Sequence, residues 1–238
     1  MTELFQEKWR AISTSDPLKS VVSGGALASS MAEVFMAGYQ TAMRQSFGFD
    51  GPDWAAFCVS EGADGYPPVT INEDGTLSGY KTWVAAAAVT QQFLLKVGRG
   101  GEARYLVLAR DAPGLTIEMK AEAEFLPELG VGRLALDHVF MGPALTLDRS
   151  QLKAFAKIEA GCILLAFLGF LQANGRRDVG AIIETLGPQV MAEPLGPALK
   201  ELALAIQNQL VGDSDLDVSM RYWERDRRLI DQYLKMLA

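Results

Sequence analysis

The sequence predicts an α+β multidomain protein with a short N-terminal helical segment, a central antiparallel β barrel or sandwich, and a C-terminal helical bundle. Three observations support this fold class. Apolar residues recur at helical spacing near the start of the chain, short runs bounded by glycine-rich turns fill its middle, and helical periodicity returns after Pro143. We therefore expect three domains, at 1–50, 51–147 and 148–238.

Composition excludes several classes of protein. The chain has 238 residues, 49% of them hydrophobic and 21% charged, which is typical of a globular protein with a sizeable core. Its net charge of -7 gives no basic surface for phosphates, so we expect no nucleic-acid partner. Cys58 and Cys162 each lie in an apolar segment and are interpreted as buried thiols of a reducing compartment. The first twelve residues lack the apolar stretch of a signal peptide, and we expect a cytoplasmic protein.

The N-terminal segment is expected to be helical to about residue 47. Thr2 or Ser15 is a candidate N-cap, whereas Pro17 and the Gly24-Gly25 pair are expected to interrupt the helix. A glycine- and proline-containing hinge at residues 48–52 then separates this segment from the β region.

The β region opens with a buried strand and a hairpin. The apolar run Ala55–Val59 ends on polar Ser60 and Glu61, so the strand delivers its carboxyl end to a loop. The hairpin pairs Val69–Asn72 with Thr76–Ala85, because the Asp-Gly between them supplies a tight turn. Further strands are expected at Gln92–Val97, Arg104–Ala109, Leu115–Lys120 and Arg133–Met141, the first two joined by the loop Gly98–Gly101.

The last of these strands contains the only histidine. Strict alternation puts His138 on the same face as Leu134, Leu136 and Phe140. A lone histidine without a cysteine cluster does not support a zinc site or a catalytic triad, so we interpret it as packed and hydrogen-bonded, and we expect no metal site.

The C-terminal region contains one unusually apolar helix. Its stretch Ala160–Ala173 is too short to span a bilayer, and it indicates the central helix of a bundle. Because its short companions leave it incompletely covered, we expect a homo-oligomer, or a complex with a full-length paralogue, formed through the C-terminal helices. The expected helices are Leu152–Ala173, Val179–Leu186, Leu195–Leu210 and about Leu216–Leu237.

A basic cluster lies in the last helix. Acidic residues are interleaved with it, so a solvated face with i,i+4 ion pairs is one interpretation. Contact with an anion, such as a cofactor pyrophosphate or a partner's acidic patch, is the other. The cluster consists of Arg221, Arg225, Arg227 and Arg228.

Two motifs in the β region, read together, resemble the middle domain of the acyl-CoA dehydrogenase family. The run Ala56–Glu61 is similar to the family's A-F-C-x-T-E-P strand, and Gly79–Ala85 to its G-x-K-x-W-I-T/S hairpin end. The segment Gly132–Met141 looks like the strand that closes that domain. The resemblance covers about residues 40–145. The residue types alone also allow another interpretation, in which Trp83 is a core aromatic residue of the hairpin and Glu61 is a carboxylate in a turn.

The resemblance implies a flavin site, with FAD as the cofactor, and acyl-CoA as the substrate class. In the family these two segments lie against the flavin isoalloxazine ring, and the loop after the first strand contacts the acyl-CoA. Tyr66 stands where the family has the contacting serine. The implied flavin-contacting residues are Phe57, Cys58, Val59, Ser60, Trp83, Val84 and Ala85.

The resemblance breaks at the catalytic base. Family chemistry needs a carboxylate to remove a proton from the thioester while the flavin accepts a hydride. The two positions that carry this base in the family hold Leu234 and Ala154 here, and neither side chain can take a proton. Two hypotheses follow. One is a degenerate, non-catalytic or partner subunit of fatty-acid metabolism, a pseudoenzyme that has kept or lost FAD. The other is a small active oxidoreductase whose base is Glu61, Asp64 or a group of a partner subunit.

Overall fold

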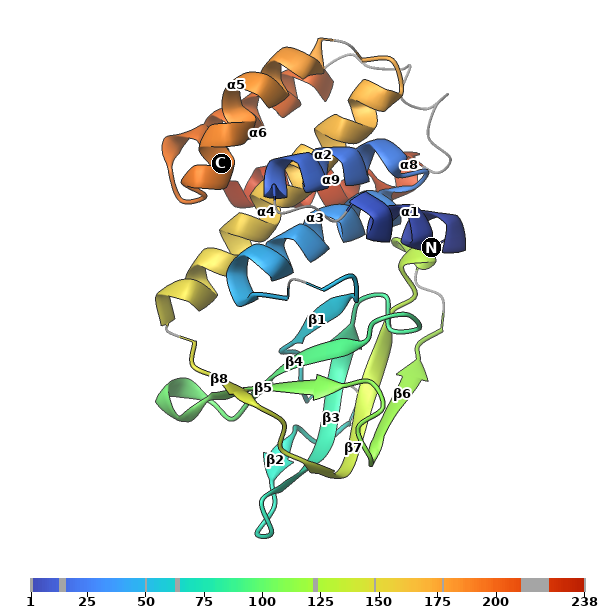
Figure 1. The fold of residues 1–238 in the computed structure, drawn as a ribbon, viewed down its shortest axis with the longest axis vertical. Helices are drawn as coiled ribbons and strands as arrows, with labels where there is room; N and C mark the ends of the chain where they lie inside the picture. Colours follow the sequence, from blue (N-terminus) through green and yellow to red (C-terminus); the bar gives the residue numbers. More distant parts are fainter. Residues whose placement is uncertain are drawn as a thin grey trace. The chain divides into compact units, whose positions relative to one another are not determined.

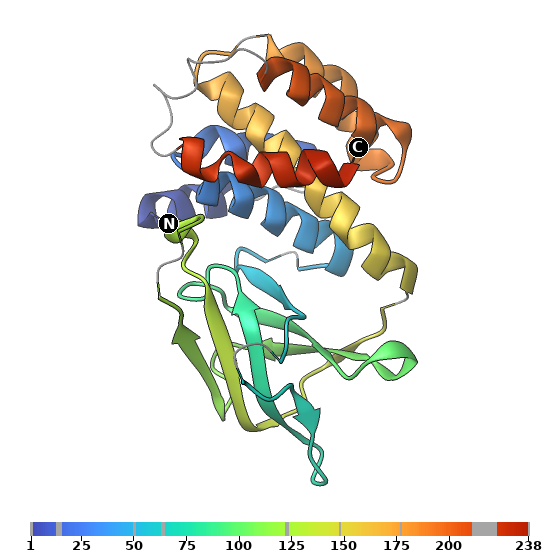
Figure 2. The same cartoon turned by 180° about the vertical axis from the view of Figure 1, so that it is seen from behind.

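The protein is described by a computed structural model, shown in Figures 1 and 2, that covers residues 2–12, 16–49, 51–62, 65–121, 124–147, 149–176, 178–210 and 223–237. These residues form two compact units. The helical unit contains Met1–Asp50, Glu124–Glu128 and Arg149–Ala238, and the β unit contains Gly51–Ala123 and Leu129–Asp148. The α+β fold class expected from the sequence is confirmed.

The N-terminal helices of the helical unit begin at side-chain caps. The Thr2 hydroxyl accepts a hydrogen bond from the Phe5 N–H at 3.2 Å, as predicted. Asp16 caps the next helix by accepting from the Lys19 N–H at 3.1 Å, whereas Ser15 lies outside the described residues. The helices are α1 (Glu3–Ile12), α2 (Pro17–Leu27), α3 (Met31–Phe47), α4 (Arg149–Ala173), α5 (Val179–Ala192), α6 (Pro197–Leu210), α8 (Trp223–Asp226) and α9 (Arg228–Leu237).

The Gly24-Gly25 pair does not interrupt a helix, contrary to the prediction. Helix α2 runs through both glycines and ends at Leu27. A Cβ on Gly24 would lie 2.2 Å from a Trp9 ring carbon, and a Cβ on Gly25 would lie 1.8 Å from the Ala166 carbonyl oxygen of α4. These glycines allow close packing within the helical unit, and that packing outweighs their low helix propensity.

Helix α4 is the centre of the helical unit, as its apolar sequence predicted. It packs against α2, α3, α5, α6 and α9, and Figure 2 shows α9 lying across it. It contains the one described segment long and apolar enough to cross a membrane, Ser150–Ala173, and 72% of the most apolar window of that segment is buried within the protein. We therefore interpret α4 as a core helix, closed by a turn at Gly175, whose φ is +94°.

The later helices differ from the prediction at their ends. Helix α5 continues past the expected end at Leu186 to Ala192 with Pro188 inside it. Helix α6 begins at Pro197, where a proline lacks only an N–H that has no intrahelical partner. The expected last helix is two helices, α8 and α9, separated at Arg227, and residues 216–222 lie outside the described residues.

In the part of the β unit that the structure describes, the strands form two four-stranded sheets. Their facing side chains, among them Leu77, Phe93, Leu95, Leu106 and Leu134, form one apolar core. The first sheet has the order β1 (Ala55–Cys58), β4 (Gln92–Val97), β5 (Arg104–Ala109), β8 (Ala144–Leu145), and the second β2 (Thr70–Ile71), β3 (Thr76–Val84), β7 (Gly132–Phe140), β6 (Leu115–Met119).

One strand pair departs from the antiparallel prediction. Strand β1 is parallel to β4, whereas the other named pairs are antiparallel. The long connection between these two strands contains the whole β2–β3 hairpin, so it has the length that a parallel crossover needs.

The predicted hairpin is present with the predicted turn. Thr70 pairs with Ser78 and Ile71 with Leu77. The Asp74 carboxylate accepts hydrogen bonds from the backbone N–H and the hydroxyl of Thr76, which hold the pKa of Asp74 below its ordinary value. Gly75 has a φ of +80°, the conformation that favours glycine in this turn.

The interpretation of His138 as a packed core residue is wrong. The pairing of β3 with β7 shifts between Gly79–Leu136 and Leu77–Val139, so two residues of β7 face one of β3. His138 takes a left-handed φ of +50° in this bulge, and the alternation reverses after it. The side chain is therefore exposed, hydrogen-bonded through Nδ1 to Asp137 at 2.8 Å, and this bond raises the pKa of His138.

Candidate functional site

The ends of β1 and β3 meet in the β unit. The Thr82 N–H donates a hydrogen bond to the Ser60 carbonyl oxygen at 2.9 Å. This bond joins the two sequence segments singled out above, although the whole β2–β3 turn separates them in the chain. The two motifs are therefore neighbours in space and together make one candidate site.

We define the candidate surface by three side chains of these segments that are accessible. Val59 is 44% exposed, Ser60 is exposed and Trp83 is half-buried. Together they offer an apolar contact, a hydroxyl and an aromatic ring next to backbone amides at a strand end. A planar, electron-poor ring system can use such a combination of stacking surface and hydrogen-bonding groups.

The other predicted contact residues are buried or half-buried. Cys58, Val84 and Ala85 are fully buried. The Ala85 carbonyl oxygen accepts a hydrogen bond from the Thr90 hydroxyl at 3.0 Å, which fixes the turn after β3. Phe57 is half-buried, and its ring centroid lies 6.3 Å from that of Tyr105.

A buried ion pair joins the residues next to Ser60 and Thr82. Lys81 is fully buried, and its ammonium group donates to the Glu61 carboxylate and to the Lys96 carbonyl oxygen. Burial lowers the pKa of Lys81, whereas the hydrogen bond and the negative charge of Glu61 oppose this shift. In the sequence Lys81 is marked only as a motif position, because its partners are 20 and 15 residues away in the chain.

Cys58 is structural rather than reactive. Burial raises the pKa of its thiol to about 12, and the nearby charge of Lys81 only partly opposes this. Cys162 in the helical unit is also buried and free, with a raised pKa. Both thiols are therefore neutral at physiological pH, as expected of small buried side chains.

Tyr66, the predicted substrate contact, lies against the second sheet. Its ring centroid is 4.8 Å from that of Tyr80, and the Arg133 guanidinium lies 4.1 Å from its ring centre. Arg133 is also 3.6 Å from the Glu118 carboxylate. The ring is thus fixed between β3 and β7 by an aromatic pair and a cation–π contact.

The two family base positions lie on α4 and α9 of the helical unit. Ala154 is half-buried on α4. Leu234 is half-buried on α9 and lines a groove of about 180 Å³ that also includes Ala203 and Leu204 of α6. Neither position offers a proton acceptor.

A further carboxyl group, which no sequence motif indicates, lies on α4. Glu159 is hydrogen-bonded by the hydroxyl of Tyr233 on α9. Burial raises the pKa of Glu159 to about 7, and the hydrogen bond from Tyr233 only partly opposes this shift. Burial and the charge of Glu159 also raise the pKa of Tyr233. The clue in the sequence was a single acidic residue directly before the apolar run of the core helix.

Arginines of the basic cluster contact other residues of the same chain, so the cluster is not a uniformly solvated face. Arg225 pairs with the Glu128 carboxylate at 3.1 Å and with Asp226, and these contacts raise its pKa. Arg228 lies 4.2 Å from the ring centre of Phe125. The expected i,i+4 pairing is found for Arg227 with Asp231 at 3.7 Å, and Arg221 lies outside the described residues.

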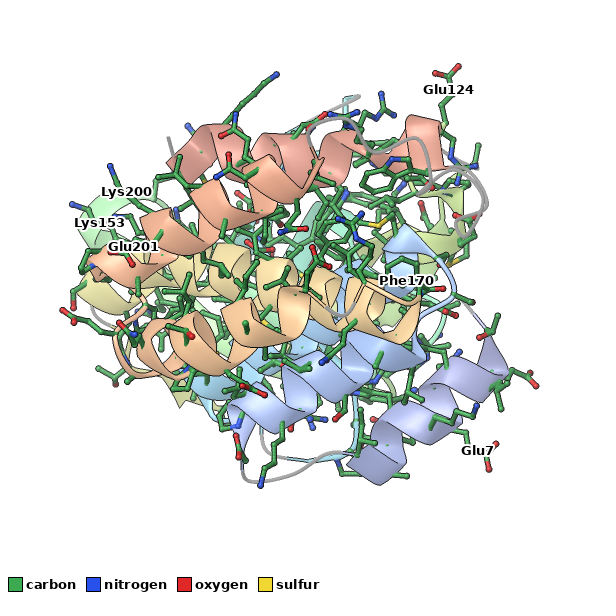
Figure 3. All side chains as sticks on the ribbon, turned by 90° about the horizontal axis from the view of Figure 1, so that it is seen from above. Glu7, Glu124, Lys153, Phe170, Lys200 and Glu201 are labelled. Carbon is green, nitrogen blue, oxygen red and sulfur yellow. The ribbon has the colours of Figure 1, made fainter. Side chains whose placement is uncertain are left out.

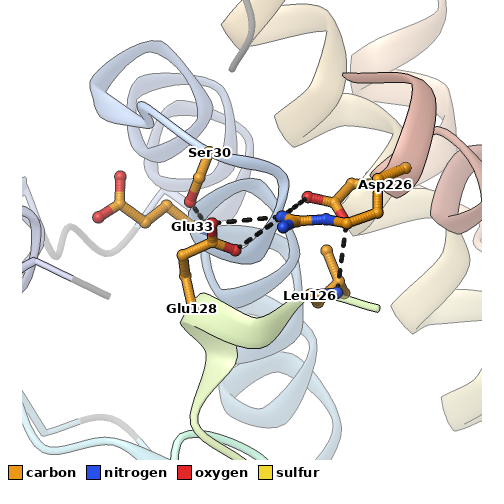
Figure 4. A network of polar contacts seen from close by, with 6 residues as sticks. Ser30, Glu33, Leu126, Glu128 and Asp226 are labelled. Carbon is orange, nitrogen blue, oxygen red and sulfur yellow. Dashed lines mark hydrogen bonds and ion pairs between the residues drawn. The ribbon is translucent and has the colours of Figure 1, made fainter. Parts of the chain in front are cut away.

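The network in Figure 4 attaches segment 124–128 to the helices of the same unit. Buried Asp226 accepts a hydrogen bond from the Leu126 N–H at 3.3 Å. Glu33, also shown there, is buried, and its carboxylate accepts from the backbone and hydroxyls of Thr2 and Ser29. Burial alone would raise the pKa of Glu33, but these four hydrogen bonds hold it below its ordinary value. These carboxylates are therefore structural.

Metal chemistry has no support in the described residues. Over the ranges that the structure covers, no three His, Cys, Asp or Glu side chains are grouped so that they could hold an ion.

The two-sheet β unit and the helical unit together have an acyl-CoA dehydrogenase-like fold. A solved structure described as an FAD-dependent dehydrogenase matches with a TM-score of 0.63 at 14% identity, covering 97% of this chain and 86% of that one. The FAD complex of PigA matches with a TM-score of 0.62 at 13% identity, covering 100% and 84%. The prolyl acyl carrier protein oxidase AnaB matches with a TM-score of 0.60 at 15% identity, covering 86% and 79%.

These likenesses show the fold that the sequence motifs predicted. At this level of identity they assign no substrate or activity. No protein-family model matches the chain, and no curated protein matches it either.

Proposed function

We propose that the chain is a flavin-binding protein of the acyl-CoA dehydrogenase-like fold that acts as a non-catalytic or partner subunit. The observation that carries the flavin proposal is the hydrogen bond from Thr82 to Ser60, because it brings the two predicted flavin-contacting segments together. Two solved structures of similar fold are named as an FAD-dependent dehydrogenase and an FAD complex, which supports FAD as the cofactor.

The residues at the site fit a flavin ring. The indole of Trp83 and the side chain of Val59 would contact the ring plane, and the Ser60 hydroxyl and strand-end amides would hydrogen-bond its polar edge. Phe57, Cys58, Val84 and Ala85 would support these groups from within the β unit. When bound, the flavin would supply a hydride acceptor.

The proposal of a non-catalytic role rests on the apolar base positions. Neither Ala154 nor Leu234 can remove a proton, so α,β-dehydrogenation of an acyl-CoA lacks its usual acceptor. An acyl-CoA or a related thioester remains the ligand class that this fold suggests, with Tyr66 beside it. We propose a soluble, cytoplasmic location in keeping with the buried α4 and the two free buried thiols.

An active oxidoreductase is the second candidate, and Glu159 is the observation that favours it. A carboxyl group with a pKa of about 7 exchanges protons near neutral pH, which suits a general base. The alternatives named from the sequence are weaker, because Glu61 is paired with buried Lys81 and Asp64 lies outside the described residues.

We also propose self-association, or assembly with a full-length paralogue, through the C-terminal helices. The groove between α6 and α9 is bordered by Leu204, which is 60% exposed, and Met236 on α9 is 49% exposed. Lys200 and Glu201 point outward from α6 in Figure 3, so opposite charges flank the apolar residues and could pair across a two-fold axis. Light scattering after gel filtration should show a dimer or larger for the wild type and a monomer for Leu204→Glu. A monomeric wild type that binds no relative would contradict the assembly proposal.

Titration with FAD tests the proposed cofactor. Quenching of FAD fluorescence should give saturable binding to the wild type and weaker binding to Trp83→Leu and Ser60→Ala. Phe140→Leu is a matched control, since this aromatic residue of the β unit is 76% exposed and lies opposite Thr76, at the other end of β3 from Trp83. Equal affinity for Trp83→Leu and the wild type would reject the proposed site.

A further inference from the structure

Lys81 connects strands β3 and β4 and the segment after β1 through one buried ammonium group. Its side chain starts on β3 of the second sheet, and Nζ donates to the Lys96 carbonyl oxygen on β4 of the first sheet. It also donates to the carboxylate of Glu61, which follows β1. No part of the Lys81 side chain is exposed, whereas 15% of the Glu61 side chain is.

Such a charge restricts the positions of its partners. An ammonium group without water must keep its carboxylate and its hydrogen-bond acceptors, because a buried unpaired charge is strongly unfavourable. Glu61 therefore cannot move away from Lys81 without exposing or neutralising that charge. The loop after β1 is anchored at this residue.

The anchor lies directly beside the proposed flavin surface. Glu61 is adjacent in sequence to Ser60, and Lys81 is adjacent to Thr82. The hydrogen bond between Ser60 and Thr82 and the ion pair between Glu61 and Lys81 are thus two neighbouring links between the same two segments. Two links fix the orientation of the strand end, whereas one would leave it free to pivot.

We infer that Lys81 and Glu61 are positioning residues, whose buried pair sets the placement of Val59 and Ser60 against Trp83 and thereby the shape of the flavin surface. The inference rests on the proposed function for its ligand, FAD. Its structural part, the placement of the strand end, is independent of any ligand.

The same pair could instead contribute only to global stability, and a double variant separates the two roles. Glu61→Gln leaves the buried ammonium without a carboxylate, whereas Lys81→Met combined with Glu61→Gln removes both charges. If the pair acts only through stability, FAD affinity and stability should recover together in the double variant. If the pair positions the strand end, stability should recover while FAD affinity and local order do not.

Two measurements on the full chain read out local order and binding. Hydrogen exchange of the Thr82 amide should accelerate by about tenfold or more in Lys81→Met and in the double variant, while amides of β5 keep wild-type rates. The FAD dissociation constant should rise by about tenfold or more in the same variants. Lys96→Met is the matched control, because it removes a neighbouring lysine side chain but keeps the carbonyl oxygen that Lys81 contacts.

The outcomes distinguish failure of the inference from failure of the proposed function. Wild-type Thr82 exchange and wild-type FAD affinity in the double variant would overturn the inference while leaving the flavin proposal intact. A wild type that binds no FAD would reject the proposed function, and Thr82 exchange would then decide the positioning role alone. Slow exchange in the folded Lys81→Met variant would contradict that role.

Discussion

The β unit and the helical unit each bury an ionisable side chain, and they do so in different ways. In the β unit, Lys81 lies against the carboxylate of Glu61 and a backbone carbonyl oxygen. In the helical unit, Glu159 is hydrogen-bonded by a neutral phenol, Tyr233, and its pKa is raised to about 7. A paired charge fixes local geometry, whereas an acid bonded to a neutral group responds to pH. The buried pair of the β unit therefore constrains the candidate binding segments, while Glu159 of the helical unit can exchange its proton near neutral pH.

Loss of the Glu61 carboxylate in the β unit should lower the free energy of unfolding more than any other substitution considered below. Glu61→Gln is expected to lower the free energy of unfolding by about 3 kcal/mol, because it leaves the ammonium of Lys81 buried and unpaired. Adding Lys81→Met should recover most of that loss. Urea unfolding of the three proteins measures this, and a single variant as stable as the wild type would show that the pair is not a constraint.

A substitution that disturbs the close packing of α2 on α4 should lower the free energy of unfolding nearly as much. Gly25→Ala places a Cβ within 1.8 Å of the Ala166 carbonyl oxygen, so α2 and α4 must separate. We expect a loss of about 2–3 kcal/mol in the free energy of unfolding. Gly101→Ala, where nothing lies within 4 Å of the added Cβ, is the control and should change stability little. A thermal shift of the same size for both substitutions would contradict this account of the glycine.

Glu159 in the helical unit should make the free energy of unfolding depend on pH. Its raised pKa means that the folded protein holds this proton more tightly than the unfolded chain, so stability falls as pH rises from 4.5 to 7 and then levels off. Glu159→Gln should therefore match the wild type near pH 4 and exceed it above pH 7 by up to about 3 kcal/mol. Urea unfolding across this range is the measurement, with Glu201→Gln on the exposed side of α6 as the control. A constant difference at all pH values would show that burial does not perturb this carboxyl group.

The attachment of segment 124–128 should have a smaller effect. Asp226→Asn weakens the pairing with Arg225 and the hydrogen bond from the Leu126 N–H, and we expect a loss of about 1–2 kcal/mol. Asp231→Asn removes only the more exposed pair with Arg227 and should cost less than about 0.5 kcal/mol. Equal losses for the two variants would indicate that burial of Asp226 is unimportant.

Sequence patterns predicted the parts of the fold that depend on local interactions. The Asp-Gly turn, the cap at Thr2 and the apolar α4 follow from neighbouring residues, and the structure has all three. The Gly24-Gly25 pair was misread because its role is a contact with α4, far away in the chain. His138 was misplaced because strict alternation cannot anticipate a bulge set by pairing with another strand.

In the candidate site, too, local motifs could be recognised in the sequence whereas contacts between distant residues could not. The residues expected at the flavin were named because two motifs carry them, and their role stays a prediction. The pair of Lys81 with Glu61 and the bond between Glu159 and Tyr233 were missed, since each depends on which strands or helices become neighbours in space. Polar partners of buried ionisable groups are therefore the part of this molecule that only the three-dimensional structure supplies.

We propose that the chain presents a flavin surface while its usual base positions are apolar. The visible absorption spectrum of the FAD-loaded, gel-filtered protein, before and after anaerobic addition of an acyl-CoA, tests both halves of this claim. We predict a flavin band that co-elutes with the protein and keeps its intensity when the thioester is added. A protein that elutes without flavin would contradict the first half of the claim, and a band that bleaches on addition of the thioester would contradict the second.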